Sequence, residues 1–526
     1  MGETYIEHGG TVASGVEPAG ASRALRRFLG VVGLLAALAI TAQVITALRS
    51  RHEITQVESI VGFHATMLAN GAGLYYDFEH YPFTVSPYGP LFYSLAAVLH
   101  QAGLPVLLAG RLISLLALLL LLYLCWRLLL LYTEDQATAL VGTLLIAATA
   151  NLLNWGTVGQ SDMLGLCFSM AGFYQYSLYR SSGRRASLAW SGLAIALAVF
   201  TKQSFVAAGA SVALLVFLAN RRRGLWFTAC LSACGLALAL GLNALVEGRY
   251  FQNAVLANLN PFSMEKVWRH LQYFLPAAGG LLVLTAAGWA RGKPAARLHP
   301  LHVYLLAAAG VMALTAPKVG SDLNYQVETM VLLGLCAGWS LHRLDFLPLW
   351  LRRDPGWITL LQIPLLLHIV LNLALTAKTV LQRNVLEEFR RQEMAALRPY
   401  LTPQKRVLSV QIDPLLQAGK PLEVEPLIYT LLVNAGLVDP EPVRRDLAER
   451  RFSLVILYED IFSGPMLSTN AEVPSLPEAH LEEIRNHYRL VAHIPGALLA
   501  GDFLYEPIAE PATSSPPSAT SHPQDP

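Results

Sequence analysis

Long apolar runs separated by short polar stretches dominate roughly the first 380 residues of the chain. Such runs approach the roughly 20 apolar residues that a helix needs to cross the hydrocarbon core of a bilayer. We therefore predict about eleven transmembrane helices, at residues 28–48, 105–131, 137–153, 163–179, 187–201, 204–219, 224–246, 270–290, 301–316, 325–341 and 357–377. The apolar run at 91–102 is shorter, and we interpret it as a re-entrant or interfacial segment.

The pattern changes near residue 380. Residues 380–400 are charged with a helical period, whereas two later runs, 406–413 and 452–458, are typical of strands. The segments between those runs, 425–436 and 440–451, are typical of helices. A small α/β domain is therefore expected after the membrane region.

The organisation predicted from these patterns has four parts. They are a cytoplasmic segment (1–27), a polytopic membrane domain (28–379) whose first outer loop is 50–104, an α/β domain (380–508) and a tail (509–526). The tail is rich in Pro, Ser and Thr, a composition typical of disorder.

Composition narrows the function classes. Hydrophobic residues make up 54% of the 526 residues and charged residues only 14%, and the mean hydropathy is +0.44, so the apolar surface must be buried in a bilayer. The 38 basic and 36 acidic side chains give a net charge of +2, which excludes a polybasic nucleic-acid binder. The five cysteines all lie inside apolar runs, so neither a disulfide framework nor a metal pair is predicted.

Basic residues set the expected orientation. If the N-terminus is cytoplasmic, the inner segments carry nearly twice as many Lys and Arg residues as the outer ones, in agreement with the positive-inside rule. Eleven crossings then place the C-terminal domain outside. In this orientation the ionisable residues near the spans gather at the outer ends, namely Glu58, Asp77, Arg111, Asp162, Lys202, Lys318, Asp322 and Glu328. Because charges near hydrocarbon are expensive and usually functional, one outer face is predicted to hold an acid–base cluster.

Each of these features also has a purely structural interpretation. The aromatic residues of 71–93 suit a membrane interface, and Lys202 suits a turn with a snorkelling side chain. Asp162 suits a helix N-cap, and Gly320 and Asn324 suit a turn. Metal-ligand spacing is absent from the loop histidines, His64, His80 and His100. The sequence contains no P-loop, dinucleotide fingerprint, G-x-S-x-G or HExxH motif.

Five stretches carry a resemblance to a known family. They are Glu58 through Gly71 to Asp77, Tyr81-Pro-Phe-Thr-Val-Ser-Pro-Tyr-Gly-Pro-Leu-Phe-Tyr93, Gly159-Gln-Ser-Asp162, Phe200-Thr-Lys-Gln203, and Lys318-Val-Gly-Ser-Asp-Leu-Asn-Tyr325 followed by Glu328. In their order and spacing, over roughly residues 25 to 460, the chain resembles the GT-C type membrane glycosyltransferases. That group includes the protein O-mannosyltransferases and the lipid A aminoarabinose transferases. The chain is most similar to bacterial members that use polyprenyl-phosphate sugars in the cell envelope.

The resemblance implies an all-α polytopic membrane protein of the bacterial inner membrane with a small extracytoplasmic α/β domain. It implies inverting transfer of a sugar from a polyprenyl-phosphate donor to a hydroxyl of a glycan, lipid or protein acceptor. The family often carries an acidic pair at the start of the first outer loop, where this chain has Val57-Glu58 and therefore one acid. Some members use a divalent cation, and the carboxylate spacing here does not decide whether this one does.

The same resemblance assigns roles to individual residues. Glu58 is the expected base, with Asp162 or Asp77 as its catalytic partner. Lys202, with Lys318 or Arg111, is expected to meet the charge of the donor phosphate. The expected sugar or acceptor contacts are Tyr75, Tyr76, Tyr88, Gln203, Asp322, Asn324, Tyr325 and Glu328.

Two other function classes stay open. A transporter or lipid flippase predicts charged or helix-breaking residues at mid-membrane, whereas the middles of these spans are mostly Leu, Ala, Val and Gly. A non-catalytic scaffold whose outer domain binds a partner needs no acid–base cluster. The placement of the charges at one end of the spans therefore favours the enzyme.

Overall fold

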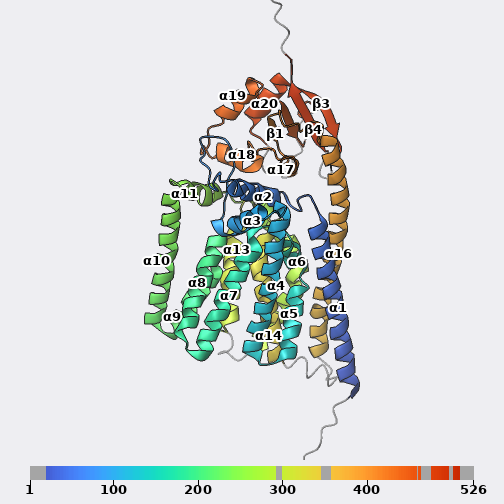
Figure 1. Cartoon of the computed structure of the whole chain (residues 1–526). Helices are drawn as coiled ribbons and strands as arrows, with labels where there is room; N and C mark the ends of the chain where they lie inside the picture. The colour runs from blue at the N-terminus through green and yellow to red at the C-terminus, as the bar shows by residue number, and fades with distance from the viewer. Residues whose placement is uncertain are drawn as a thin grey trace, which may run out of the picture. The chain divides into compact units, whose positions relative to one another are not determined.

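A computed structural model describes residues 19–291, 299–344, 357–458, 460–463, 476–496 and 501–509. Residues 1–18 of the predicted cytoplasmic segment and 510–526 of the predicted tail lie outside the described residues. The chain divides into two compact units, each of which is described by itself (Figure 1). The helical unit comprises Met1–Ser50, Tyr88–Leu240 and Pro261–Asn384, and the sheet unit comprises Arg51–Pro87, Gly241–Asn260 and Val385–Pro526.

The helical unit consists of helices. They are α1 (Ala19–Arg49), α3 (Pro90–Gln101), α4 (Val106–Thr133), α5 (Gln136–Ala147), α6 (Ala150–Gly156), α7 (Ser161–Ser182), α8 (Arg185–Thr201), α9 (Ala207–Ala219), α10 (Arg221–Leu245), α12 (Met264–Arg291), α13 (Pro300–Thr315), the 3₁₀ turn η3 (Leu323–Gln326), α14 (Val327–Arg343) and α16 (Trp357–Leu397). Two of them, α10 and α16, continue past the bounds of the helical unit into residues of the sheet unit. Each predicted transmembrane segment falls on one of these helices, except that 137–153 is divided between α5 and α6 by a bend of 70°.

The described helices differ in whether their length and apolar composition suit a membrane crossing. By length and composition, four described helices can cross a membrane (α4, α10, α12 and α16), or five if α5 and α6 form one span. The helices α8, α9 and α13 are apolar but shorter than 18 residues. The chain is therefore an integral membrane protein, and the expected count of about eleven spans stays a prediction.

Small residues allow close helix contacts in the helical unit. A Cβ added to Gly142 of α5 would lie 3.1 Å from the Cα of Gly338 in α14. An apolar core of residues from α5, α12, α14 and α16 surrounds this contact. Because apolar side chains gain little by moving from lipid to protein, such close approach stabilises helix pairs through dispersion contacts.

The sheet unit is built on four strands in the order β1-β2-β4-β3. They are β1 (Val407–Ser409), β2 (Leu454–Leu457), β3 (Tyr488–Ile494) and β4 (Asp502–Pro507). β1 and β2 pair in parallel, and β4 pairs antiparallel with both β2 and β3. The remaining elements are α2 (Gln56–Ala69), α11 (Arg249–Ala254), the 3₁₀ turn η1 (Leu256–Asn258), α17 (Asp413–Gln417), α18 (Pro426–Asn434), α19 (Glu441–Ala448) and α20 (Glu478–His487).

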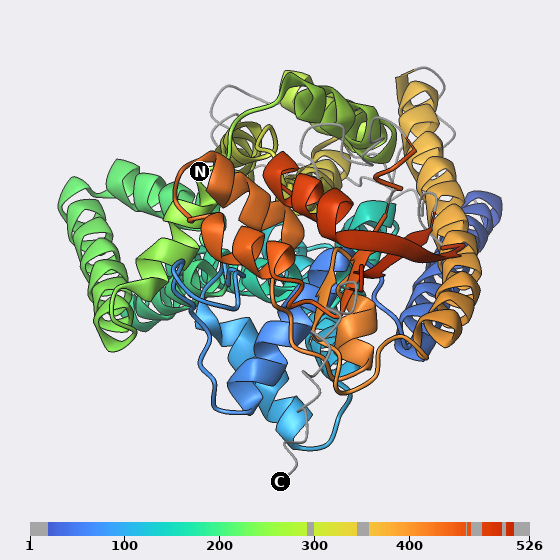
Figure 2. The same ribbon diagram turned by 90° about the horizontal axis from the view of Figure 1, so that it is seen from above.

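Both faces of β2 are buried. Val455 and Leu457 belong to an apolar core with residues of α18, α19 and α20, which Figure 2 shows beside the strands. Leu454 and Ile456 belong to a second core with residues of α2, α17 and the end of α16. Successive side chains of a strand point to opposite faces. The unbroken apolar run of β2 therefore supplies apolar side chains to the cores on both faces of the sheet.

The structure confirms part of the expected α/β domain and adds to it. The runs at 406–413 and 452–458 contain β1 and β2, and the two segments between them contain α18 and α19. β3, β4 and α20 were not predicted. α16 continues through residue 380 without a break, and the C-terminal segment of the sheet unit begins at Val385.

The first outer loop belongs to the sheet unit over residues 51–87, although the sequence placed it in the membrane domain. It contains α2, and the apolar run at 91–102 forms α3. Phe83 pairs with Val424 in a parallel bridge: the N–H of Phe83 donates to the carbonyl of Glu423, and that of Glu425 donates to the carbonyl of Phe83, both at 2.9 Å. These backbone bonds tie the loop to the C-terminal residues.

Candidate functional site

Asp162 and Lys202 form a buried ion pair in the helical unit. Asp162 lies in the first turn of α7, where the helix dipole favours negative charge, and Lys202 follows the last residue of α8 in extended conformation. The two helices form a hairpin that turns at Gly183, so the start of α7 lies beside the end of α8. The Lys202 Nζ is 2.7 Å from the Asp162 Oδ1, and the residues are only 1% and 3% exposed.

Two tyrosine rings flank the Lys202 ammonium. Its Nζ lies 4.8 Å from the ring centroid of Tyr88 and 4.7 Å from that of Tyr325. Cation–π attraction at such distances contributes about 0.5–2 kcal/mol. Tyr88 is positioned by the next residue, Gly89, because a Cβ there would lie 1.7 Å from the carbonyl oxygen of Phe200 at the end of α8. The sequence therefore needs glycine at this position.

Asn324, from η3, completes this group of side chains. Its Nδ2 donates to both carboxylate oxygens of Asp162 at 3.2 Å. The Oδ1 of Asn324 and the Oγ of Ser161 are buried and have no hydrogen-bond partner among the described residues. An unpaired buried polar atom costs about 1–3 kcal/mol, so a ligand with hydroxyl or phosphate groups suits them. We refer to Tyr88, Asp162, Lys202, Asn324 and Tyr325 as the Lys202 cluster.

Two further predicted residues of the helical unit bind groups of the protein itself. Arg111 is 1% exposed, and its Nη1 donates to the carbonyls of Ala47 at 2.9 Å and Ser50 at 2.6 Å, at the end of α1. Glu328 accepts a hydrogen bond of 2.6 Å from the Tyr304 hydroxyl. Their expected contacts with donor or acceptor stay predictions.

The other three lie on connecting segments. Asp322 caps η3 by accepting from the N–H of Leu323 at 2.7 Å. Lys318 pairs with Phe262 in an isolated antiparallel bridge. Gln203 is half-buried directly after Lys202. Their expected contacts with donor or acceptor stay predictions.

The predicted acids of the first outer loop lie in the sheet unit. Glu58 is 1% exposed, and its Oε2 accepts from the N–H of Ile54 at 2.8 Å, which holds the carboxylate at the start of α2. The Asp77 Oδ1 accepts from the N–H groups of Glu79 at 3.1 Å and His80 at 3.0 Å, which forms a turn. Partial burial raises the pKa of Asp77, but these hydrogen bonds together outweigh burial, so the net pKa is lowered.

The two tyrosines that precede Asp77 are also buried in the sheet unit. The ring of Tyr75 meets that of Tyr250 edge-on at 5.2 Å, and the ring of Tyr76 lies 5.5 Å from that of His64. The hydroxyl of Tyr76 is buried and has no hydrogen-bond partner among the described residues. Their roles in sugar stacking stay predictions.

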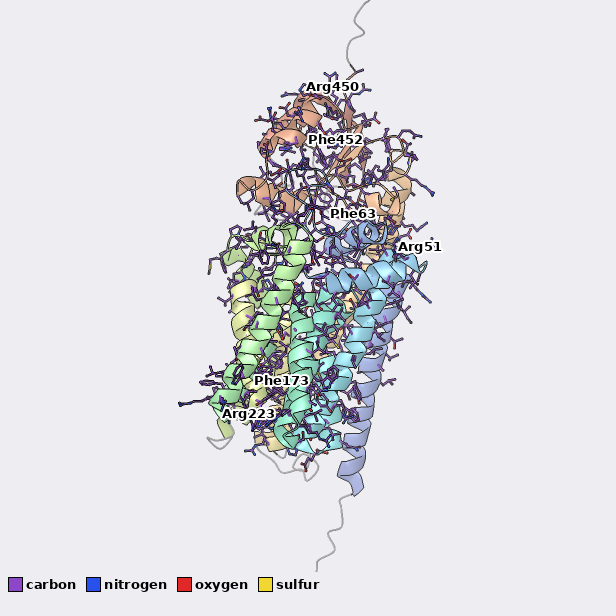
Figure 3. All side chains as sticks on the ribbon, turned by 60° about the vertical axis from the view of Figure 1, so that its left-hand side comes forward. Arg51, Phe63, Phe173, Arg223, Arg450 and Phe452 are labelled. Carbon is purple, nitrogen blue, oxygen red and sulfur yellow. The ribbon has the colours of Figure 1, made fainter. Side chains whose placement is uncertain are left out.

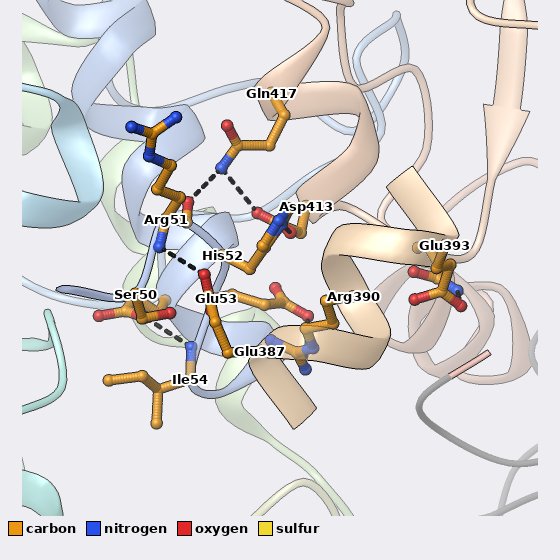
Figure 4. Close-up of polar contacts among 12 residues, drawn as sticks. Ser50, Arg51, His52, Glu53, Ile54, Glu387, Arg390, Glu393, Asp413 and Gln417 are labelled. Atoms are coloured by element: carbon orange, nitrogen blue, oxygen red, sulfur yellow. Dashed lines mark hydrogen bonds and ion pairs between the residues drawn. The ribbon is translucent and has the colours of Figure 1, made fainter. Parts of the chain in front are cut away.

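A buried acid–base cluster beside this loop was not predicted from the sequence. Figure 4 shows that it draws on the segment after α1, on α16 and on α17. The His52 Nδ1 lies 2.8 Å from the Asp413 Oδ2, and an Arg390 guanidinium nitrogen lies 3.6 Å from the Glu53 Oε1. We refer to these four residues as the Glu53 cluster.

The environment of the Glu53 cluster changes the proton affinity of its groups. Burial raises the pKa of Glu53 to about 7, although the positive charge of Arg390 opposes that shift. Burial lowers the pKa of His52, but the hydrogen bond and charge of Asp413 outweigh burial, so the net pKa is raised. The only sequence signal for this cluster is a short charged stretch, His52-Glu53, directly after the first span.

The residues that the structure describes include no group of three or more His, Cys, Asp or Glu side chains suited to a metal ion. The structure therefore assigns no ligands to a divalent cation.

Comparisons with known proteins find matches in three-dimensional structure but not in sequence. No family model matches the chain, and no curated protein matches it. Two crystal structures of ArnT from Cupriavidus metallidurans match, and each match covers 91% of this chain and 98% of that one. The structure bound to undecaprenyl phosphate has a TM-score of 0.58 at 15% identity, and the apo structure has a TM-score of 0.55 at 16% identity. The apo oligosaccharyltransferase from Archaeoglobus fulgidus has a TM-score of 0.52 at 12% identity, over 82% of this chain and 69% of that one. The chain therefore has the fold of the GT-C membrane glycosyltransferases, as its sequence resemblance implied.

Proposed function

We propose that the chain is an inverting membrane glycosyltransferase that moves a sugar from a polyprenyl phosphate to an acceptor hydroxyl at the extracytoplasmic face of the bacterial inner membrane. The observation that carries the proposal is the Lys202 cluster, in which a carboxylate holds a buried cation beside buried polar atoms that lack partners. The fold supports it, because ArnT, a solved protein of this fold, binds undecaprenyl phosphate.

The Lys202 cluster suits the departure of a phosphate. The acceptor oxygen attacks C1 of the sugar, the bond from C1 to the phosphate oxygen breaks, and its electron pair stays on the phosphate. The Lys202 ammonium stabilises that developing charge, while Asp162 and the two rings hold the ammonium in place before the reaction begins. Asn324 Oδ1 and Ser161 Oγ are placed to bind hydroxyl groups of the sugar.

Glu58 keeps the role of base as a separate proposal. It removes the proton of the acceptor hydroxyl as the oxygen attacks C1. Its bond from the N–H of Ile54 also fits a purely structural helix cap. Glu58→Gln separates the two roles, since an amide oxygen still accepts from that N–H but cannot take the proton.

The test uses the full chain in lipid nanodiscs with a panel of labelled polyprenyl-phosphate pentoses and hexoses, and with lipid, glycan and protein acceptors. Transferred sugar and released polyprenyl phosphate are measured for wild type, Glu58→Gln and Glu53→Gln. The last variant is a matched control, because it changes a second buried carboxyl group of the same segment. A thermal melt checks that each variant folds.

Three results decide between the readings. Turnover that is lost in Glu58→Gln and kept in Glu53→Gln supports both the function and the base. Equal turnover in wild type and Glu58→Gln overturns the base and leaves the function standing. If the wild type neither binds nor cleaves any donor, the transferase is excluded and a transporter or scaffold takes its place.

A further inference from the structure

A large apolar groove lies between α8 and α10 in the helical unit. Its volume is about 1230 Å³, larger than the roughly 300–1,000 Å³ typical of sites for small molecules. Its walls are one face of α8, from Arg185 to Ala196, and one face of α10, from Arg222 to Leu238. The helices come close at Gly192, where an added Cβ would lie 3.5 Å from the ring of Phe227.

The length of the groove matches one leaflet of a membrane. At 1.5 Å per residue, the lining runs about 16 Å along α8 and about 24 Å along α10. Half of a hydrocarbon core about 30 Å thick is about 15 Å, and headgroups extend beyond it. The groove therefore has the reach of a lipid chain in one leaflet rather than that of a complete membrane span.

The charged groups of the groove lie at one end only. Arg185 opens α8, and Arg222 and Arg223 lie in the first turn of α10. Figure 3 labels Arg223 at that end of the helices, where its Nη1 donates to the Tyr179 hydroxyl at 3.3 Å. The groove lining contains no carboxylate, and in the described part of the chain none of the three arginines forms an ion pair.

A cationic end and an apolar length are the complement of an anionic amphiphile. Guanidinium groups bind phosphate oxygens with paired hydrogen bonds, and basic pockets between transmembrane helices suit phospholipid headgroups. The N-termini of α8 and α10 add two helix dipoles of the same sign at this end. The large volume favours a lipid with two chains over one with a single chain.

We infer that this groove is a binding site for an anionic glycerophospholipid, whose phosphate lies at Arg185, Arg222 and Arg223 and whose chains lie between α8 and α10. It is separate from the Lys202 cluster, since Arg185 begins α8 and Lys202 follows its end. The inference does not depend on the proposed transferase activity. The alternative is that these arginines serve only to set the orientation of the chain in the membrane, in which case no lipid would be bound in the groove.

The first test measures lipid retention by native mass spectrometry of the full chain with phosphatidylglycerol or phosphatidylcholine. The wild type is expected to keep phosphatidylglycerol preferentially, and Arg222→Gln with Arg223→Gln is expected to lower retention about tenfold or more. Arg180→Gln with Arg184→Gln is the matched control, because it removes the same charge from residues outside the groove lining. Equal losses in the two double variants, or equal retention of both lipids, would overturn the inference.

A second test places the chains of the lipid. Trp226 lines the groove, whereas Trp190, also exposed, does not. Phosphatidylglycerol with brominated chains should quench wild-type fluorescence, and Trp226→Phe should remove that component while Trp190→Phe leaves it. Ala196→Trp, which fills the groove without changing charge, should abolish preferential retention. Quenching that does not depend on Trp226, or retention of polyprenyl phosphate in place of phosphatidylglycerol, would contradict the assigned occupant.

Discussion

Asp162→Asn tests whether the buried ion pair holds the Lys202 cluster together. The substitution keeps the shape of the side chain but leaves the Lys202 ammonium, 1% exposed, without its carboxylate at 2.7 Å. Breaking a buried pair by removing one partner costs about 3–5 kcal/mol, because the other charge stays buried. Lys202→Met leaves the Asp162 carboxylate in the same position and should cost a similar amount.

The double variant, Asp162→Asn with Lys202→Met, distinguishes pairing from general disruption. Replacing both members of a buried pair is often close to neutral, so the double variant should be more stable than either single variant. Because the shift in melting temperature per kcal/mol falls with chain length, about 1–2 °C per kcal/mol is expected here, and each single variant should lose about 3 °C or more of melting temperature.

The assay is a thermal melt of purified protein in detergent at fixed protein and lipid concentrations. Asn324→Ala is a useful companion, since it removes a neutral donor to the same carboxylate without leaving a charge unpaired. Two results would refute the reasoning: a single variant that melts within 1 °C of wild type, or a double variant that loses as much as both singles added together.

Two further predictions concern Gly89 in the helical unit and Glu53 in the sheet unit. Gly89→Ala should lower the free energy of unfolding by about 1–3 kcal/mol or more, because the new Cβ would lie 1.7 Å from the carbonyl oxygen of Phe200. The control, Gly279→Ala, has nothing within 4 Å of its new Cβ and should be neutral or slightly stabilising. Equal melting temperatures of the two variants would contradict the close contact at Gly89. Burial raises the folded pKa of Glu53 to about 7 from an ordinary 4.5, so its contribution to stability is fully present below about pH 4.5 and is lost as pH rises through 7. Melting temperatures from pH 4.5 to 8 should therefore fall less with pH in Glu53→Gln than in wild type, and parallel curves would show that Glu53 does not contribute.

The sequence predicted the parts of the site better than their arrangement. The apolar runs predicted the helices, because a helix that lies in a membrane is apolar over most of its length and this is visible in the sequence. Asp162, Lys202 and Asn324 were each singled out because they border those runs. Their joining at one point depends on the α7–α8 hairpin and on η3, which brings Asn324 to Asp162 across 162 positions of the chain.

The Glu53 cluster shows why the rest could not be predicted. His52 and Asp413 are 361 positions apart, and no local period links them. β3 and β4 were missed for a separate reason. They form an antiparallel hairpin with mixed exposure, so no unbroken apolar run marks them, whereas β1 and β2 are fully buried.

The measurement that tests the central claim most directly is cleavage of a polyprenyl-phosphate sugar by the wild type and by the Asp162→Asn, Lys202→Met double variant. The wild type should cleave at least one donor of the panel. The double variant should melt like the wild type yet lose about 100-fold or more in turnover, since a preorganised group that stabilises developing negative charge contributes about 10²–10³ to kcat. A folded double variant with full turnover would contradict the role of the Lys202 cluster in binding the donor phosphate.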